Sequence, residues 1–200
     1  MNTVSDQKAK AMRLFAILGC IFAVCDIVFT GLITKHFPLS SILQNAVLIV
    51  CLLFLVSAYN KHDKNLMNMM AGAVMTELLL LQIQYTDFSL AEAEGLYLLS
   101  CVASLVLLIT LFLAFIFHLY TTFRHNDSGS AVKFGVVLFR IALFIAAAEI
   151  VISVFLSSPF SIVRFMNWSS WYLMEVAVLG ALIFLRLRLN ELKTAKEAQL

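Results

Sequence analysis

Charged residues are scarce in this sequence of 200 residues: they make up 13% of the chain, against about 25% in soluble domains. Apolar residues make up 62%. This composition excludes a soluble globular domain and is typical of an integral membrane protein in contact with the lipid bilayer. The formal net charge of +2 is also too small for the strongly basic face that nucleic-acid binding requires, so we expect no nucleic-acid partner.

Cysteine and recognised enzyme motifs are equally sparse. The four cysteines all lie within apolar runs and none forms a C-x-x-C pair, which excludes a disulfide framework and disfavours a zinc or copper site. No histidine lies at mid-depth on two facing spans, so haem is not expected. The chain contains no P-loop, nucleophile elbow or zinc-protease motif. The sequence therefore favours a protein that is not an enzyme and predicts no cofactor other than a bound cation, whose identity stays open.

Helix-breaking residues are few, with two prolines and seven glycines, and both Pro38 and Pro159 fall between apolar runs. We therefore expect unbroken helices, unlike transporters whose helices are interrupted at the binding site. Six runs are long enough to cross a hydrocarbon core of roughly 30 Å. They cover residues 11–33, 39–59, 66–84, 95–120, 134–157 and 165–187.

Short connections between these runs predict the architecture. They favour an all-α, polytopic six-helix transmembrane bundle of three sequential antiparallel hairpins, forming a single domain over residues 1–200. The apolar spacing of the last span continues beyond its end. Residues 188–200 are therefore predicted to form a cytoplasmic helical tail, which could bind a cytoplasmic partner or lie at the membrane interface.

The basic residues predict the orientation, because Lys and Arg near the ends of spans stay on the cytoplasmic side. Eleven of the 14 basic residues flank the spans on one side if both termini are cytoplasmic. They are Lys8, Lys10, Arg13, Lys61, Lys64, Arg124, Lys133, Arg186, Arg188, Lys193 and Lys196. We therefore predict a multi-pass integral membrane protein with cytoplasmic N- and C-termini.

Four acids lie well inside the predicted spans, where each is expected to cost several kcal/mol. They are Asp26, Glu77, Glu149 and Glu175. With a rise of 1.5 Å per residue, all four fall at a depth of roughly 10–15 Å from the predicted external side. Their agreement in depth predicts a carboxylate layer rather than isolated polar positions.

The nearby basic residues are too few to pair with four acids. Arg140, about two turns from the cytoplasmic end of its span, is a candidate counter-charge, and Asn45 is a candidate neutral ligand at similar depth. Unpaired carboxylates must be protonated, neutralised by a bound cation or hydrated by an aqueous cavity. We therefore hypothesise a transporter-like or channel-like protein that handles protons, cations or a cationic small molecule. A homo-oligomer could supply a pore if the gap within one bundle is too narrow.

Three alternatives remain open at this stage. Protonated acids could serve only to hold the helices together by hydrogen bonds. The chain could instead be a non-catalytic sensor, effector or assembly module that acts through protein contacts. A catalytic site at the cytoplasmic face is a third alternative, although its residue types are ordinary at a membrane interface. Its candidate residues are His62, Asp63, His118, His125 and Asp127.

Overall fold

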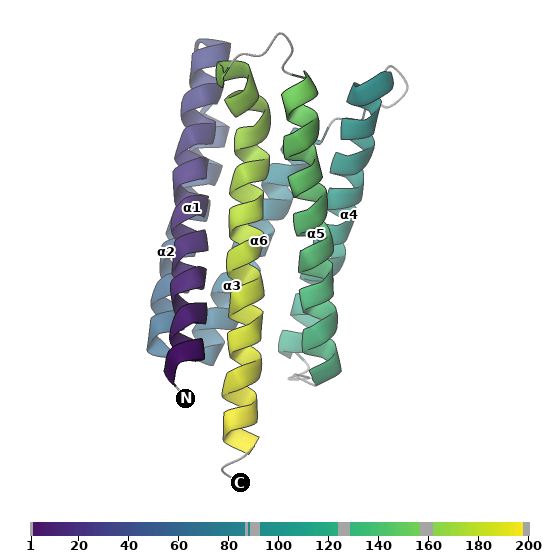
Figure 1. Cartoon of the computed structure of the whole chain (residues 1–200). Coiled ribbons are helices and arrows are strands. Elements are labelled where there is room, and N and C mark those ends of the chain that lie inside the picture. The colour runs from purple at the N-terminus through teal and green to yellow at the C-terminus, as the bar shows by residue number, and fades with distance from the viewer. Residues whose placement is uncertain (1, 87, 89–92, 124–128, 157–161, 198–200) are drawn as a thin grey trace.

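A computed structural model describes residues 2–86, 88, 93–123, 129–156 and 162–197, without the side chains of 2–6, 129–132, 164, 167–168 and 190–197. The described residues form six helices and no strand, which confirms the all-helical prediction (Figure 1). The helices are α1 (Asn2–Thr34), α2 (Leu39–Lys61), α3 (Lys64–Tyr85), α4 (Gly95–Phe123), α5 (Gly129–Leu156) and α6 (Ile162–Glu197).

Five helices contain segments long and apolar enough to cross a membrane. These segments are Gln7–Thr34, Leu39–Lys61, Lys64–Tyr85, Gly95–Phe123 and Lys133–Leu156. Their exposed side chains include many leucines, isoleucines, valines and phenylalanines, which suit contact with lipid tails. The chain is therefore consistent with a multi-pass integral membrane protein. The sixth predicted span, residues 165–187, lies within α6, and its crossing of the bilayer stays a prediction.

The helix α6 is the most enclosed helix of the bundle. It packs most extensively against α1 and α5 and also reaches α3, and every described side chain from Ser169 to Leu189 is buried or half-buried. The other helices contact their neighbours in the chain, and α1 closes the arrangement by packing on α6. The division into three hairpins stays a prediction, because the most extensive packing joins α1 to α6, which hold the two ends of the chain.

The two chain termini lie at the same end of the bundle (Figure 1). We call this the terminal end and the opposite one the distal end. The helix α6 continues to Glu197 and projects beyond the other helices at the terminal end, while a separate tail over residues 188–200 stays a prediction. Its cytoplasmic location stays a prediction, as does the orientation of both termini.

Close packing of α1 on α6 depends on a glycine. A Cβ atom added at Gly180 would lie 2.7 Å from Cδ1 of Phe15, which is closer than real side chains allow. The Phe15 ring also stacks on Phe184, with ring centroids 5.8 Å apart. Gly180 therefore lets the aromatic side chain of α1 lie directly on the backbone of α6.

The turn between α2 and α3 is held by its own polar groups. His62 has a left-handed backbone conformation, with φ of 56°, and its N–H donates to the carbonyl groups of Ala58 and Tyr59. The Asp63 side chain caps α3 by accepting a hydrogen bond of 3.1 Å from the N–H of Leu66. These two residues therefore have structural roles at the terminal end of the bundle.

Candidate functional site

Asp26 of α1 lies at the centre of a buried hydrogen-bond network that joins four helices. Its Oδ2 accepts from the Tyr85 hydroxyl of α3 at 2.8 Å and from Asn45 Nδ2 of α2 at 3.2 Å. Its Oδ1 accepts from the Ser170 hydroxyl of α6 at 3.0 Å. Asp26, Asn45 and Ser170 have no exposed surface. The structure therefore brings Asp26 and Asn45 together. The three groups that donate hydrogen bonds to Asp26 are all neutral.

Glu149 of α5 and Glu175 of α6 form a second acidic cluster. Glu149 Oε2 accepts a hydrogen bond of 2.8 Å from the Ser100 hydroxyl of α4, whereas its Oε1 has no partner among the described residues. Neither carboxyl oxygen of the fully buried Glu175 has a hydrogen-bond partner there. The two carboxyl groups interact electrostatically with each other and with Tyr172 of α6. This pair is therefore buried with far fewer hydrogen bonds than Asp26 has.

A buried amide and two aromatic residues connect these clusters. Gln82 of α3 accepts from Nε1 of Trp171 at 2.7 Å and donates to the carbonyl of Ser104 at 3.2 Å. The Ser104 hydroxyl in turn lies 2.6 Å from the hydroxyl of Tyr172. The Trp171 ring stacks on Tyr85, the partner of Asp26, with centroids 5.1 Å apart and planes 11° apart. A continuous set of polar and aromatic contacts therefore joins the Asp26 network to the Glu149 and Glu175 pair.

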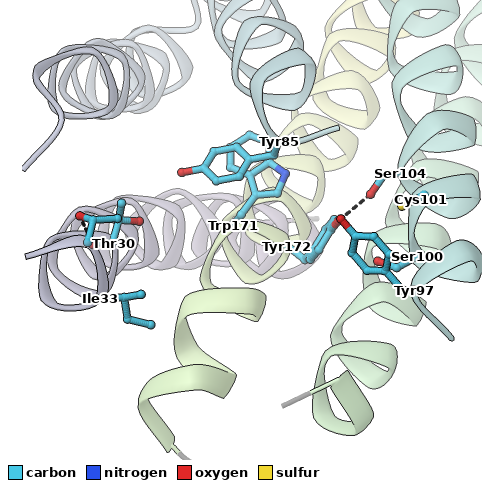
Figure 2. A pocket seen from close by; sticks show the side chains of 10 residues that line it. Thr30, Ile33, Tyr85, Tyr97, Ser100, Cys101, Ser104, Trp171 and Tyr172 are labelled. Atoms are coloured by element: carbon cyan, nitrogen blue, oxygen red, sulfur yellow. Dashed lines mark hydrogen bonds between the residues drawn. The ribbon is translucent and has the colours of Figure 1, made fainter. Parts of the chain in front are cut away.

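A cavity of about 300 Å³ lies among these contacts at the distal end of the bundle. Figure 2 shows the stacked rings of Tyr85 and Trp171 apart from Tyr172, which lies with Ser104 beside Tyr97 and Ser100. Ten residues of α1, α3, α4 and α6 line the cavity. They are Thr30, Ile33, Thr34, Tyr85, Tyr97, Ser100, Cys101, Ser104, Trp171 and Tyr172.

The carboxyl groups stand behind this lining rather than in it. Tyr85 and Ser100, which line the cavity, donate to Asp26 and Glu149 respectively, both at 2.8 Å. Each of these two acids is thus hydrogen-bonded to a residue that lines the cavity. A hydroxyl can both donate and accept, so these positions could pass a proton or orient a dipole toward a bound cation.

The other two predicted site residues lie elsewhere. Glu77 is half-exposed on α3 and interacts electrostatically with Cys51 of α2. Arg140 is exposed on α5. The structure thus gathers Asp26, Asn45, Glu149 and Glu175 around the cavity region, whereas Glu77 and Arg140 are not part of the hydrogen-bond networks described above.

The sequence reasoning missed the aromatic and amide residues of the site. Tyr85, Tyr97, Trp171 and Tyr172 lie near the predicted ends of spans, where aromatic residues are frequent as membrane anchors, so their positions alone do not indicate a site. The available signal was Gln82, an amide within a predicted span and one turn before Tyr85, which needs a partner inside an apolar bundle. That partner is Trp171.

A separate polar cluster lies toward the terminal end. Arg186 of α6 is 6% exposed and its Nη2 contacts both Nδ1 of His118 and, at 3.4 Å, the Thr121 hydroxyl. Since a guanidinium group only donates, His118 Nδ1 accepts, and its Nε2–H donates to the Asn68 carbonyl at 3.0 Å. The cluster therefore joins α3, α4 and α6, and it uses both ring nitrogens of His118.

This arrangement is relevant to the alternative in which a catalytic site lies at the predicted cytoplasmic face, which is the terminal end of the bundle. His118 is occupied by two hydrogen bonds, and His62 and Asp63 cap helices. His125 and Asp127 lie outside the described residues. Among the residues that the structure describes, no group of three or more His, Cys, Asp or Glu side chains could hold a metal ion.

Comparisons of the chain with protein-family models, with curated proteins and with solved structures found no match. The function of the site is therefore inferred from its own chemistry.

Proposed function

We propose that this protein is a membrane carrier or channel-like protein that binds cations in the distal cavity and couples this binding to the protonation of buried carboxyl groups. Asp26, Glu149 and Glu175 are the groups that carry the coupling, and Asn45 holds Asp26 in place. In the membrane, the distal end faces away from the cytoplasm and both termini are cytoplasmic, as the distribution of basic residues indicates.

The observation that carries the proposal is the burial of three acids from three helices. Asp26 and Glu149 accept hydrogen bonds from neutral groups, and Glu175 accepts none from the described residues. An isolated carboxylate in a low-dielectric interior costs several kcal/mol, and hydroxyl and amide donors offset only part of this cost. Such groups are stable when they hold a proton or when a cation lies nearby. A cavity lined by the residues that donate hydrogen bonds to Asp26 and Glu149 provides a path for a proton or for a cation.

Purely structural acids would be arranged differently. An acid that only holds helices together gains by satisfying both of its carboxyl oxygens with hydrogen bonds. Among the described residues, neither carboxyl oxygen of Glu175 has a hydrogen-bond partner, and Glu175 interacts electrostatically with Glu149. This is an unfavourable arrangement for packing alone, and arrangements of this kind are concentrated at functional sites.

The test is the simultaneous replacement Asp26→Asn and Glu149→Gln in purified protein reconstituted into liposomes. The expected result is a loss of at least about tenfold in proton-coupled cation flux, with an unchanged circular-dichroism spectrum and elution volume. A matched control carries Asp63→Asn and Glu94→Gln, which remove one aspartate and one glutamate outside the site, and Asn preserves the helix cap. Unchanged flux in the folded double variant would contradict the proposal.

The projection of α6 beyond the bundle favours a second function, that of a sensor, effector or assembly module. In this alternative the tail binds a cytoplasmic partner, and self-association through it would give the homo-oligomer. Deletion of residues 190–200 separates the two functions. The module loses its partner when the tail is deleted, whereas the carrier retains its cation flux.

A further inference from the structure

We infer that the ligand of the distal cavity is an organic ammonium ion, a cation with apolar substituents on its nitrogen, rather than a metal ion. This inference rests on the proposed function and names the substrate class of the same site. It follows from three properties of the cavity: its aromatic surface, the position of its carboxyl groups and its size.

Aromatic residues are prominent in the lining of the cavity. Four of its ten lining residues are Tyr85, Tyr97, Trp171 and Tyr172. Tyr85 and Tyr97 are each 37% exposed, so neither residue is fully covered by the rest of the protein. The face of an aromatic ring attracts cations, and clusters of such rings recognise alkylated ammonium groups. Aromatic rings are, in contrast, poor ligands for the hard metal ions that carboxylates bind.

The carboxyl groups are placed to attract a charge without coordinating it. Asp26 and Glu149 reach the cavity only through the hydroxyl groups of Tyr85 and Ser100. A calcium or magnesium ion needs about six or more oxygen ligands in direct contact, which these recessed carboxylates do not supply. An alkylated ammonium ion needs no such shell, because its charge is spread over its substituents and interacts at longer range with acids and rings.

The size of the cavity sets an upper limit on the ligand. Its volume of about 300 Å³ is at the lower end of the range for small-molecule sites, roughly 300–1,000 Å³. The cavity therefore fits a compact ion of the size of choline. The hydroxyl groups of Ser104 and Thr30 add polar positions for a substituent such as the choline hydroxyl.

The binding experiment uses the protein's own fluorescence. The chain has two tryptophans, and the Trp168→Phe variant leaves Trp171 of the cavity as the only reporter. Choline is titrated into this variant, and its uncharged analogue 3,3-dimethylbutan-1-ol is titrated in parallel. We expect a saturable change of Trp171 fluorescence with choline and at least about tenfold weaker binding of the analogue, which has the same shape without the charge.

Variants of Tyr97 test the aromatic contribution. Tyr97→Leu should weaken choline binding roughly 2- to 30-fold, the range that cation–π interactions span, whereas Tyr97→Phe keeps the ring and should stay within about twofold. Tyr120→Leu is the matched control, since this exposed tyrosine lies on the same helix and outside the cavity. Equal binding of choline and the analogue, or equal affinity of Tyr97→Leu and wild type, would overturn the inference.

The failure of the inference can be distinguished from that of the proposed function. If choline does not bind while sodium, potassium or proton flux still depends on Asp26 and Glu149, the inference is wrong and the proposed function stands. If choline binds with the expected preferences and no flux depends on these acids, the inference stands and the proposed function is wrong.

Discussion

Asp26 and Glu175 should respond in opposite directions when each carboxyl group is replaced by an apolar group of similar shape. Asp26 accepts three hydrogen bonds, from Asn45, Tyr85 and Ser170. Replacement by leucine removes all three, and a net loss of about 0.5–1.5 kcal/mol for each gives a destabilisation of about 2–5 kcal/mol. Asp26→Asn can still accept from two of these donors, so its effect should be smaller, about 1 kcal/mol.

Replacement of Glu175 by an apolar residue is expected to stabilise the protein, because its carboxyl oxygens accept no hydrogen bond from the described residues. Glu175→Met keeps the length of the side chain and removes two buried polar atoms. It also removes the electrostatic interaction with Glu149. An unsatisfied buried polar group costs about 1–3 kcal/mol, so the methionine variant should be more stable than wild type by about that amount.

The assay is equilibrium unfolding in mixed micelles, in which a denaturing detergent is titrated against a mild one and helix content is followed by circular dichroism. The free energies of unfolding of the two variants should differ by at least about 3 kcal/mol, with wild type between them. Comparable destabilisation by both would refute the reasoning. It would mean that Glu175 holds the bundle together as Asp26 does, and the case for a functional role of the pair would be lost.

Three other predictions concern packing and orientation. His118→Ala removes the acceptor of the buried Arg186 guanidinium and should destabilise the protein by about 1–3 kcal/mol in the same assay. Adding Arg186→Met removes the donor as well and should abolish this destabilisation. Gly180→Ala places a Cβ against Phe15 and should lower the stability of the protein by about 1–3 kcal/mol. Adding Phe15→Leu should restore most of this stability, and purely additive effects of the two substitutions would contradict the packing argument. Lys35→Cys in a variant without native cysteines should react with a membrane-impermeant maleimide added outside intact cells. Labelling only after lysis would show that the orientation is the opposite of the predicted one.

The helices and the depth of the acids could be predicted because both follow from distances along one helix. An apolar run of sufficient length predicts a span, and a rise of 1.5 Å per residue places an acid within it. The direction in which each acid points could not be predicted equally well. Helices in lipid are apolar on all sides, so the residue pattern barely distinguishes a face toward protein from one toward lipid.

Glu77 illustrates this limit. It has the same predicted depth as Asp26, but the buried face of α3 is formed by residues such as Val74, Leu78 and Gln82. Glu77 comes one residue before Leu78, and at about 100° per residue this is enough to turn it off the buried face, where it interacts electrostatically with Cys51 of α2. Tyr85 lies on α3 two turns beyond Glu77 and is the residue that reaches Asp26.

Arg186 illustrates a second limit, which comes from the position of a whole helix. It was assigned to the cytoplasmic flank, because long basic side chains at the ends of spans usually extend to the interface. In the structure Arg186 is buried and bonded to His118, since α6 is enclosed by other helices along this stretch. Which helix becomes central depends on packing between segments far apart in the sequence, and no local pattern reports it.

The enclosure of α6 also has a consequence for how the protein is made. The helix α6 supplies Ser170 to Asp26, a residue synthesised 144 positions earlier. At roughly 5–20 residues per second, Asp26 waits on the order of ten seconds in the membrane before this partner exists. Nascent chains that stop before α6 therefore carry an intramembrane acid with an incomplete set of donors. Only chains that include α6 can complete the set of donors to Asp26.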